Sequence, residues 1–189
     1  MPSLPEEPTA YPDGLFKSNG DVVEDASART WWVMRTKPKQ EKAVAREHLS
    51  RSLPFFLPTT KRLRVGRRGE QASYHPLFPG YIFSYVTDEE RFEINRTGRL
   101  VTFVSVPDQT KLWGELGNLH ELLGRGLEVH PVLQIKQGSV VTIRTGPLKN
   151  ITGIVLRDAG KCRFVVQIDF LQAGAEVELN EADLDLISE

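Results

Sequence analysis

The order of apolar runs along the chain constrains the fold more than any other sequence feature. Residues 30–36, TWWVMRT, and residues 80–86, GYIFSYV, are rich in strand-forming side chains, and the second run is the strongest strand signal in the sequence. Between them, residues 40–52 carry apolar side chains on one face at helical spacing. Such an alternation predicts an α+β domain in which helices pack on a mainly antiparallel sheet.

Five further segments complete this first domain. Residues 55–57, FFL, form a short strand between two prolines, and residues 60–75 read as a β-hairpin around GRRGE. Residues 88–98 form a two-turn helix with Asp88 as N-cap. Residues 101–106, VTFVSV, predict a strand, and residues 108–124 predict a helix with leucines at helical spacing.

The rest of the chain has a different pattern. Residues 136–189 hold short strand-like runs separated by turns, which predicts a small β-barrel. Residues 125–135 lack a clear period and are expected to be a linker. Residues 1–29 contain four prolines and few clustered apolar residues, so we expect a disordered tail with a short ordered piece around Leu15 and Phe16. The alternative is a docking tail. The α+β domain then spans residues 30–124.

Composition excludes several classes of protein. The chain has 189 residues, of which 40% are hydrophobic and 26% are charged, and its net charge is -1, so it is not a uniformly basic nucleic-acid coat. Cys162 is the only cysteine, which excludes a disulfide framework within one chain. No run approaches the length of a membrane span, and the N-terminus lacks a secretory pattern. We therefore expect a cytoplasmic protein without a membrane partner.

The sequence carries none of the motifs that would indicate an enzyme. The four histidines never fall four residues apart, so no paired metal ligands of the zincin type exist. No GxSxG elbow is present, and GPLKNITG lacks the Gly-Lys-Ser/Thr end of a phosphate-binding loop. We predict no catalytic residues, no metal site and no cofactor.

A basic segment lies in the expected hairpin. Arg62 and Arg64 share one strand face, while Arg67 and Arg68 lie near the tip, beside Lys61 in the same stretch. Arginine suits phosphate because its planar fork binds two oxygens at once. The alternative is a hairpin whose charges serve only solubility, and charge alone does not separate the two.

An aromatic segment follows the hairpin directly. Tyr81 and Phe83 share one strand face and Ile82 takes the other, with Phe78 just before and Trp32 in the first strand. Core is the default for aromatic side chains in a small domain. If helices cover only one sheet face, however, these rings could form an exposed docking patch.

Two sets of motifs resemble a known family. WWVMRT, QEKAVAREHL, PLFPGYIF and VTFV, in that order, resemble the N-terminal (NGN) domain of NusG-type transcription elongation factors. GSVVTIRTGPLKNITGIV resembles the KOW domain that follows it in that family, through a pattern of residues comprising Gly138, Val140, Ile143, Gly146, Pro147, Gly153 and Val155. The resemblance covers nearly all of residues 30–189. It implies an NGN-type antiparallel sheet with helices, followed by a small KOW/SH3-like barrel.

The resemblance also implies a function. Members of this family bind RNA polymerase through an apolar patch of the N-terminal domain and reduce pausing or termination. Matching positions assign the polymerase-binding patch to Trp32, Phe78, Tyr81 and Phe83. The hairpin arginines, Arg62, Arg64, Arg67 and Arg68, would contact nucleic acid within the elongation complex.

The KOW domain of the family recruits a further partner, such as a ribosomal protein or the terminator Rho. The loop DFLQAG lies near that contact, with Phe170 as the candidate anchor. This loop differs from the Phe-Gly-Arg of the general factors, and PLFPGYIF leans towards specialised antitermination paralogues. The alternative function is an RNA-binding or ribosome-associated KOW protein that does not act on polymerase.

Overall fold

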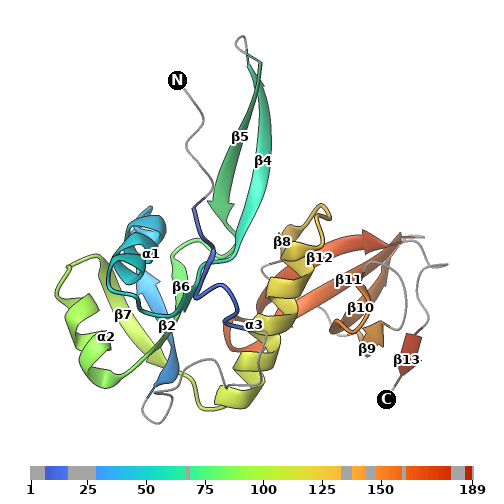
Figure 1. Cartoon of the computed structure of the whole chain (residues 1–189). Coiled ribbons are helices and arrows are strands. Elements are labelled where there is room, and N and C mark those ends of the chain that lie inside the picture. The colour runs from blue at the N-terminus through green and yellow to red at the C-terminus, as the bar shows by residue number, and fades with distance from the viewer. Residues whose placement is uncertain are drawn as a thin grey trace. The chain divides into compact units, whose positions relative to one another are not determined.

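A computed structural model describes residues 7–16, 29–66, 69–132, 138–143, 148–158, 161–179 and 186–188. The chain divides into two compact units, Met1–Gln109 and Thr110–Glu189 (Figure 1). Each unit is built on its own antiparallel sheet. The expectation of mixed α and β structure with antiparallel pairing is therefore confirmed.

Unit 1 contains a five-stranded sheet and a separate hairpin. Its strands, in spatial order, are β1 (Ala10–Tyr11), β3 (Phe55–Phe56), β6 (Tyr81–Val86), β2 (Thr30–Thr36) and β7 (Leu100–Ser105). All neighbouring pairs are antiparallel. The apolar runs that predicted strands at residues 30–36 and 80–86 thus lie side by side at the centre of the sheet.

Two helices cover one face of this sheet, which we call the helix face. Helix α1 (Glu41–Ser50) and helix α2 (Asp88–Asn95) both contribute to its core cluster. That cluster joins Met34, Val44, Ala45, Leu53, Phe55, Leu57, Ile82, Val86, Ile94 and Leu100. Burial of these side chains supplies the hydrophobic free energy that fixes both helices on the sheet.

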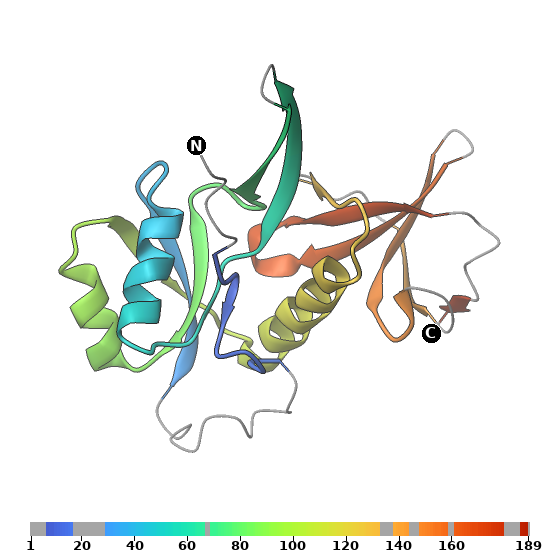
Figure 2. The same ribbon diagram turned by 45° about the horizontal axis from the view of Figure 1, so that its top comes forward.

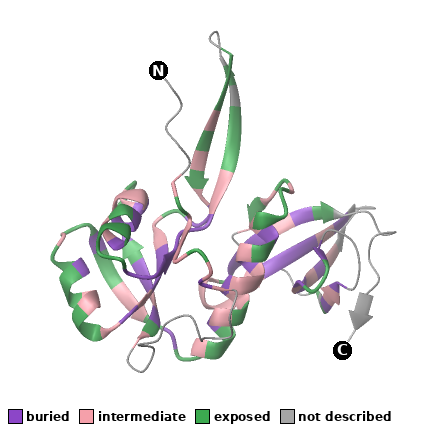
Figure 3. Cartoon of the chain, viewed as in Figure 1, coloured by how far each residue is buried: buried purple, intermediate pink, exposed green. Residues whose placement is uncertain are grey.

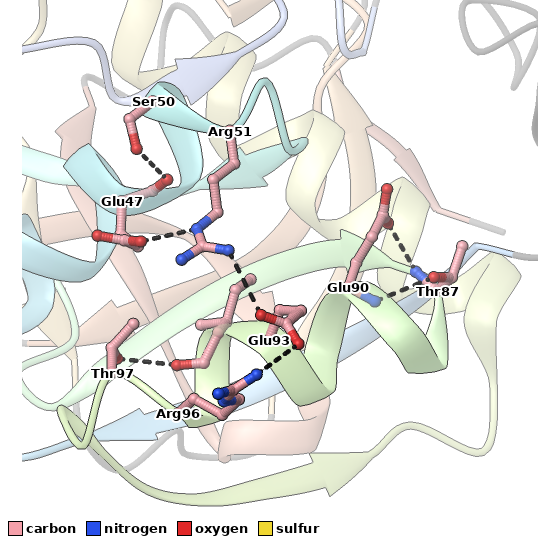
Figure 4. Close-up of polar contacts among 9 residues, drawn as sticks. Glu47, Ser50, Arg51, Thr87, Glu90, Glu93, Arg96 and Thr97 are labelled. Atoms are coloured by element: carbon pink, nitrogen blue, oxygen red, sulfur yellow. Dashed lines mark hydrogen bonds and ion pairs between the residues drawn. The ribbon is translucent and has the colours of Figure 1, made fainter.

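A capping box starts helix α2. The Thr87 hydroxyl accepts a hydrogen bond from the Glu90 N–H at 3.2 Å, and Glu90 Oε2 accepts from the Thr87 N–H at 2.9 Å (Figure 4). The N-cap is therefore Thr87, not Asp88, which is the first helical residue. The reciprocal pair satisfies two amide groups that would otherwise lack partners at the helix start.

The predicted hairpin is confirmed. Strands β4 (Thr59–Gly66) and β5 (Gly69–Pro76) pair only with each other. The ribbon projects from unit 1 in both views (Figures 1 and 2). Its described residues are mostly exposed, in contrast to the buried central strands of the sheet (Figure 3). The hairpin is therefore a surface element of unit 1.

The structure describes residues 7–16 of the predicted tail, which include the short piece around Leu15 and Phe16 that was expected to be ordered. Residues 7–16 include β1, which pairs with β3, and the Leu15 side chain is only 2% exposed. A two-residue strand leaves no periodic pattern, so sequence alone could not reveal it.

Unit 2 carries a six-stranded antiparallel sheet next to helix α3 (Gln109–Gly124). The strands, in spatial order, are β13 (Leu186–Ser188), β9 (Ser139–Ile143), β10 (Thr152–Asp158), β11 (Lys161–Ile168), β12 (Ala173–Leu179) and β8 (His130–Val132). The short 3₁₀ helix η2 (Asp169–Leu171) joins β11 to β12. The short strand-like runs predicted within residues 136–189 include β9, β10, β11 and β12.

Gly153 lies within a strand and not at a turn. It is part of β10, opposite Val141. A Cβ atom there would lie 2.6 Å from both the Phe164 ring and the Val165 carbonyl oxygen. The glycine therefore permits close packing of two strands. Gly146 and Pro147 lie outside the described residues.

Helix α3 shifts the boundary between the units. The structure divides the chain after Gln109, whereas the sequence suggested a domain end at residue 124. Two polar contacts join α3 to η2, through Lys111 and Glu115. In addition, β8 lies within the predicted linker 125–135 and pairs with β12.

Candidate docking surface and nucleic-acid interface

Strand register decides which aromatic side chains share a face of the five-stranded sheet. Phe83 lies opposite Val33, whereas Trp32 lies opposite Ser84. Directly opposed side chains share a face, and successive residues alternate. Tyr81 therefore lies on the same face as Phe83, and Trp32 lies on the helix face. The four rings predicted as one polymerase-binding patch are divided between two faces.

We call the sheet face opposite the helices the aromatic face. It carries the side chains of Trp31, Phe56, Tyr81, Phe83 and Tyr85. The Phe83 ring centre lies 6.4 Å from that of Phe56 and 6.3 Å from that of Phe78, which precedes β6. These spacings are typical of packed aromatic pairs.

Phe78 and Phe83 are buried, which corrects their assignment as docking residues. Their exposed fractions are 3% and 0%. With residues 7–16 in place, rings as buried as these stabilise the fold and are not available to a partner. The sequence could assign Phe83 to a face, but it could not reveal what covers that face.

Tyr81 is half-buried, and so it presents part of its ring at the end of the aromatic face. A tight turn holds this residue, because Gly80 adopts a positive φ of 85° that favours glycine. The Gly80 N–H donates to Glu41 Oε1 at 2.7 Å, and the Gly80 carbonyl accepts from the Thr36 N–H at 2.8 Å. The exposed Arg35 lies directly opposite Tyr81 on β2. Tyr81 is thus an aromatic side chain with a cation beside it, on a rigid turn.

Trp32 packs beneath a cation on the helix face. The Arg91 guanidinium carbon lies 4.0 Å from the centre of the Trp32 ring and 5.5 Å from that of Phe103. Arg91 also forms an ion pair with Asp88 at 3.0 Å. This cation–π contact occupies a face of the indole ring. Trp32 is thus half-buried beneath Arg91 on the helix face, which separates it from Tyr81 on the aromatic face.

The register of the hairpin shows where two of the four predicted arginines lie. Arg62 lies opposite Ser73 and Arg64 lies opposite Gln71, two positions along one face of the ribbon. The Arg62 side chain is exposed, whereas that of Arg64 is outside the description. Arg67 and Arg68, at the tip, lie outside the described residues. A polar face that carries an exposed guanidinium can reach a phosphate backbone without rearrangement.

The other hairpin face carries exposed apolar side chains, which the sequence pattern alone did not single out. Leu63 is 58% exposed and Val65 is 83% exposed. They share their face with Lys61, Glu70, Ala72 and Tyr74 by register. The alternation of TKRLRV already places Leu63 and Val65 on the face opposite Arg62 and Arg64, and this is the signal that could have revealed them.

A buried histidine links helix α1 to the sheet. His48 is fully buried; its Nδ1 lies 2.8 Å from the Val44 carbonyl oxygen and its Nε2 lies 2.8 Å from Ser84 Oγ. A carbonyl only accepts, so Nδ1 carries the proton and Nε2 accepts from the Ser84 hydroxyl. Burial lowers the pKa of His48 to about 4. The hydrogen bond to the Val44 carbonyl and the charges of Glu47 and Glu90 act in the opposite direction without offsetting it, and the charge of Arg51 adds to the lowering.

Glu90 connects the start of the domain to helix α2. Arg29 donates to both of its carboxylate oxygens, at 2.6 and 3.0 Å. Burial alone would raise the pKa of Glu90, but the bonds from Arg29 and from the Thr87 N–H outweigh it, so the pKa is lowered. Polar pairs such as Glu47 with Arg51, and Glu93 with Arg96, add surface contacts on the same helices (Figure 4). This network supports the scaffold.

Asp169 organises the loop that carries Phe170 in unit 2. Lys111 Nζ lies 2.5 Å from Asp169 Oδ2, and the Asp169 N–H donates to Glu115 Oε2 at 3.1 Å. The Lys111 ammonium lowers the pKa of Asp169, despite a smaller opposing effect of burial. Phe170 itself is half-buried. The loop is therefore fixed against α3, with part of the Phe170 ring exposed.

Among the residues that the structure describes, no three His, Cys, Asp or Glu side chains lie close enough to hold a metal ion. None of the described helices is both long and apolar enough to cross a membrane.

Comparison with known proteins finds a family model that is similar to part of the chain. The model of the NusG family, described as "Transcription termination factor nusG", matches residues 29–113, just under half of the chain. The match includes β2 through β7, and thus the aromatic face strands, both helices of the helix face and the hairpin. No curated protein matches the sequence.

A solved structure of a Thermotoga maritima protein is also similar. It is described as "Domain interaction in Thermotoga maritima NusG" and shares 21% sequence identity with this chain. The alignment covers 86% of this chain and 99% of the other, with a TM-score of 0.46.

Proposed function

We propose that this chain is a NusG-type transcription elongation or antitermination factor that binds RNA polymerase through unit 1. The match of residues 29–113 to the NusG family model carries this proposal. The half-buried Tyr81, on its turn beside Arg35, supports a docking point for an apolar surface of the polymerase. An elongation factor of this kind works in the cytoplasm and needs no cofactor.

The hairpin gives the proposed complex its second contact. A docked unit 1 would carry the exposed Arg62 face, and with it Arg64, Arg67 and Arg68, to nucleic acid held by the polymerase. Protein docking would supply specificity, while phosphate contacts would add a salt-dependent term. This combination requires no net basic charge, consistent with a net charge of -1.

Unit 2 would recruit a further partner. We propose that its strands form the KOW barrel and that the half-buried Phe170 contacts a ribosomal protein or Rho. The ordered Asp169 loop supports this role, because a fixed loop loses little conformational entropy on binding. The departure of DFLQAG from Phe-Gly-Arg favours a specialised antitermination paralogue.

An in vitro elongation assay with purified polymerase tests the proposal. The wild-type chain should shorten pauses or increase readthrough of terminators. Tyr81→Ser should abolish the effect, whereas Phe92→Ser should not, because Phe92 is 65% exposed on α2, away from the aromatic face. If the wild-type chain leaves elongation unchanged but binds RNA or ribosomes, the alternative KOW function gains support.

A salt series tests the hairpin contact separately. Arg62→Gln should reduce pause suppression more at low salt than at high salt, because screening already weakens phosphate contacts at high salt. Lys61→Gln is the matched control, since Lys61 lies on the opposite face of the same strand. Double replacement of Arg67 and Arg68 should behave like Arg62→Gln. Losses that are equal at every salt concentration would contradict nucleic-acid contact.

A further inference from the structure

The ordered N-terminal segment, residues 7–16, extends the five-stranded sheet at its β3 edge. Ala10 pairs with Phe56 and Tyr11 pairs with Phe55. The Leu57 N–H donates to the Thr9 carbonyl at 2.6 Å. The segment thus binds the edge as an added strand, the way in which many extended peptides bind sheets.

The same segment wraps around this edge and reaches both faces. Tyr11 packs against the core cluster of the helix face. A turn follows, in which the Pro12 carbonyl accepts from the N–H groups of Gly14 and Leu15, each at 2.9 Å. Leu15, 2% exposed, and Phe16 then follow on the aromatic side.

Phe16 lies on the aromatic face. Its ring is nearly parallel to that of Trp31, at 6.1 Å between centres and an interplanar angle of 2°. It meets the Phe56 ring edge-on at 5.2 Å and 76°. Phe56 in turn contacts Phe83, which shares its face with Tyr81. Phe16 therefore covers one end of the ring cluster that leads to the proposed docking residue.

We propose that the aromatic face is a binding surface for a peptide that pairs with the β3 edge and carries a Leu-Phe pair in the turn that follows, and that residues 7–16 occupy it in the free chain. Release of this segment exposes Trp31 and Phe56 and enlarges the surface that polymerase contacts. The claim that polymerase contacts the enlarged surface rests on the proposed function. The claim that the aromatic face binds this peptide segment does not.

The contacts of the segment suit reversible release. Its ladder with the sheet is only two residue pairs long, at the outer edge. The Glu7–Arg46 ion pair, 2.7 Å long, is largely exposed, and such pairs contribute little to stability. Peripheral elements of this kind open locally without unfolding of the domain. A partner can bind the face only in the open form. Its apparent affinity is therefore its intrinsic affinity multiplied by the fraction of chains that are open.

Phe16→Ala in the full chain tests the proposal, with Phe92→Ala as matched control because it removes an exposed ring from α2. Hydrogen exchange of the Leu57 amide reports on the segment directly, since this amide donates to Thr9. Phe16→Ala should accelerate that exchange about tenfold and tighten binding to purified polymerase about tenfold, in line with the loss of two aromatic contacts. Phe92→Ala should change neither.

A synthetic peptide of residues 7–16, EPTAYPDGLF, provides the second arm. Added in excess to Phe16→Ala, it should slow the Leu57 exchange and reverse the gain in polymerase affinity, whereas the peptide with Ala for Phe16 should do neither. Unchanged Leu57 exchange in Phe16→Ala, or no effect of the peptide, would overturn the proposal. Peptide binding without a change in polymerase affinity would overturn the claim of competition. If no variant binds polymerase at all, the proposed function fails, and rebinding of the peptide alone still decides whether the surface exists.

Discussion

Replacement of His48 by glutamine tests the physical account of the helix face. His48 is fully buried, and its pKa is lowered from 6.5 to about 4. The folded chain therefore binds this proton less well than the unfolded chain does. Its contribution to stability is complete above pH 6.5 and is lost as the pH falls towards 4. The pKa of His48 differs by about 2.5 between the unfolded and folded chain, and one pKa unit corresponds to about 1.36 kcal/mol. The free energy of unfolding therefore falls by about 3 kcal/mol.

Urea denaturation between pH 7.5 and pH 4 measures this loss. Tryptophan fluorescence in a Trp113→Phe background follows unit 1, because Trp31 and Trp32 both lie in its sheet. Between pH 7.5 and pH 4, the free energy of unfolding should fall in both proteins, and the fall should be about 3 kcal/mol larger for the parent than for His48→Gln. His75→Gln, which removes an exposed histidine from the hairpin, is the control. Equal pH slopes for His48→Gln and the parent would refute the assignment of His48 as a neutral, buried group.

Three further predictions concern stability and charge. Thr87→Ala should lower the free energy of unfolding by about 1 kcal/mol in urea denaturation, because it removes the cap of α2; an unchanged midpoint would contradict the capping box. Phe83→Ala should cost about 3–5 kcal/mol, since the ring is fully buried, and a cost below about 1 kcal/mol would show that the ring is not enclosed. Lys111→Ala should raise the pKa of Asp169 in an NMR titration, and an unchanged value would exclude their ion pair.

The regular elements could be predicted from local pattern. TWWVMRT corresponds to β2 residue for residue, and the helix expected at residues 40–52 is α1, shortened at both ends. The N-cap was predicted one residue late, because Asp88 is also a good capping residue. Only the reciprocal bonds between Thr87 and Glu90 decide between the two.

The candidate site could be predicted less well, because burial depends on partners far away in the sequence. Alternation assigned Tyr81 and Phe83 to one face, and the register confirms that assignment. Nothing local distinguishes the half-buried Tyr81 from the fully buried Phe83, or reveals that Phe16 lies over Trp31. The stacking of Arg91 on Trp32 likewise joins two elements that are distant in the chain.

The affinity of the purified chain for RNA polymerase, measured at equilibrium with the Tyr81→Ser and Phe92→Ser variants, tests the central claim most directly. We predict saturable binding that Tyr81→Ser weakens at least tenfold, about 1.4 kcal/mol, and that Phe92→Ser leaves unchanged. Circular dichroism would confirm that both variants are folded. Absence of binding by the wild-type chain, or equal affinities for all three proteins, would contradict the claim that the end of the aromatic face at Tyr81 docks the polymerase.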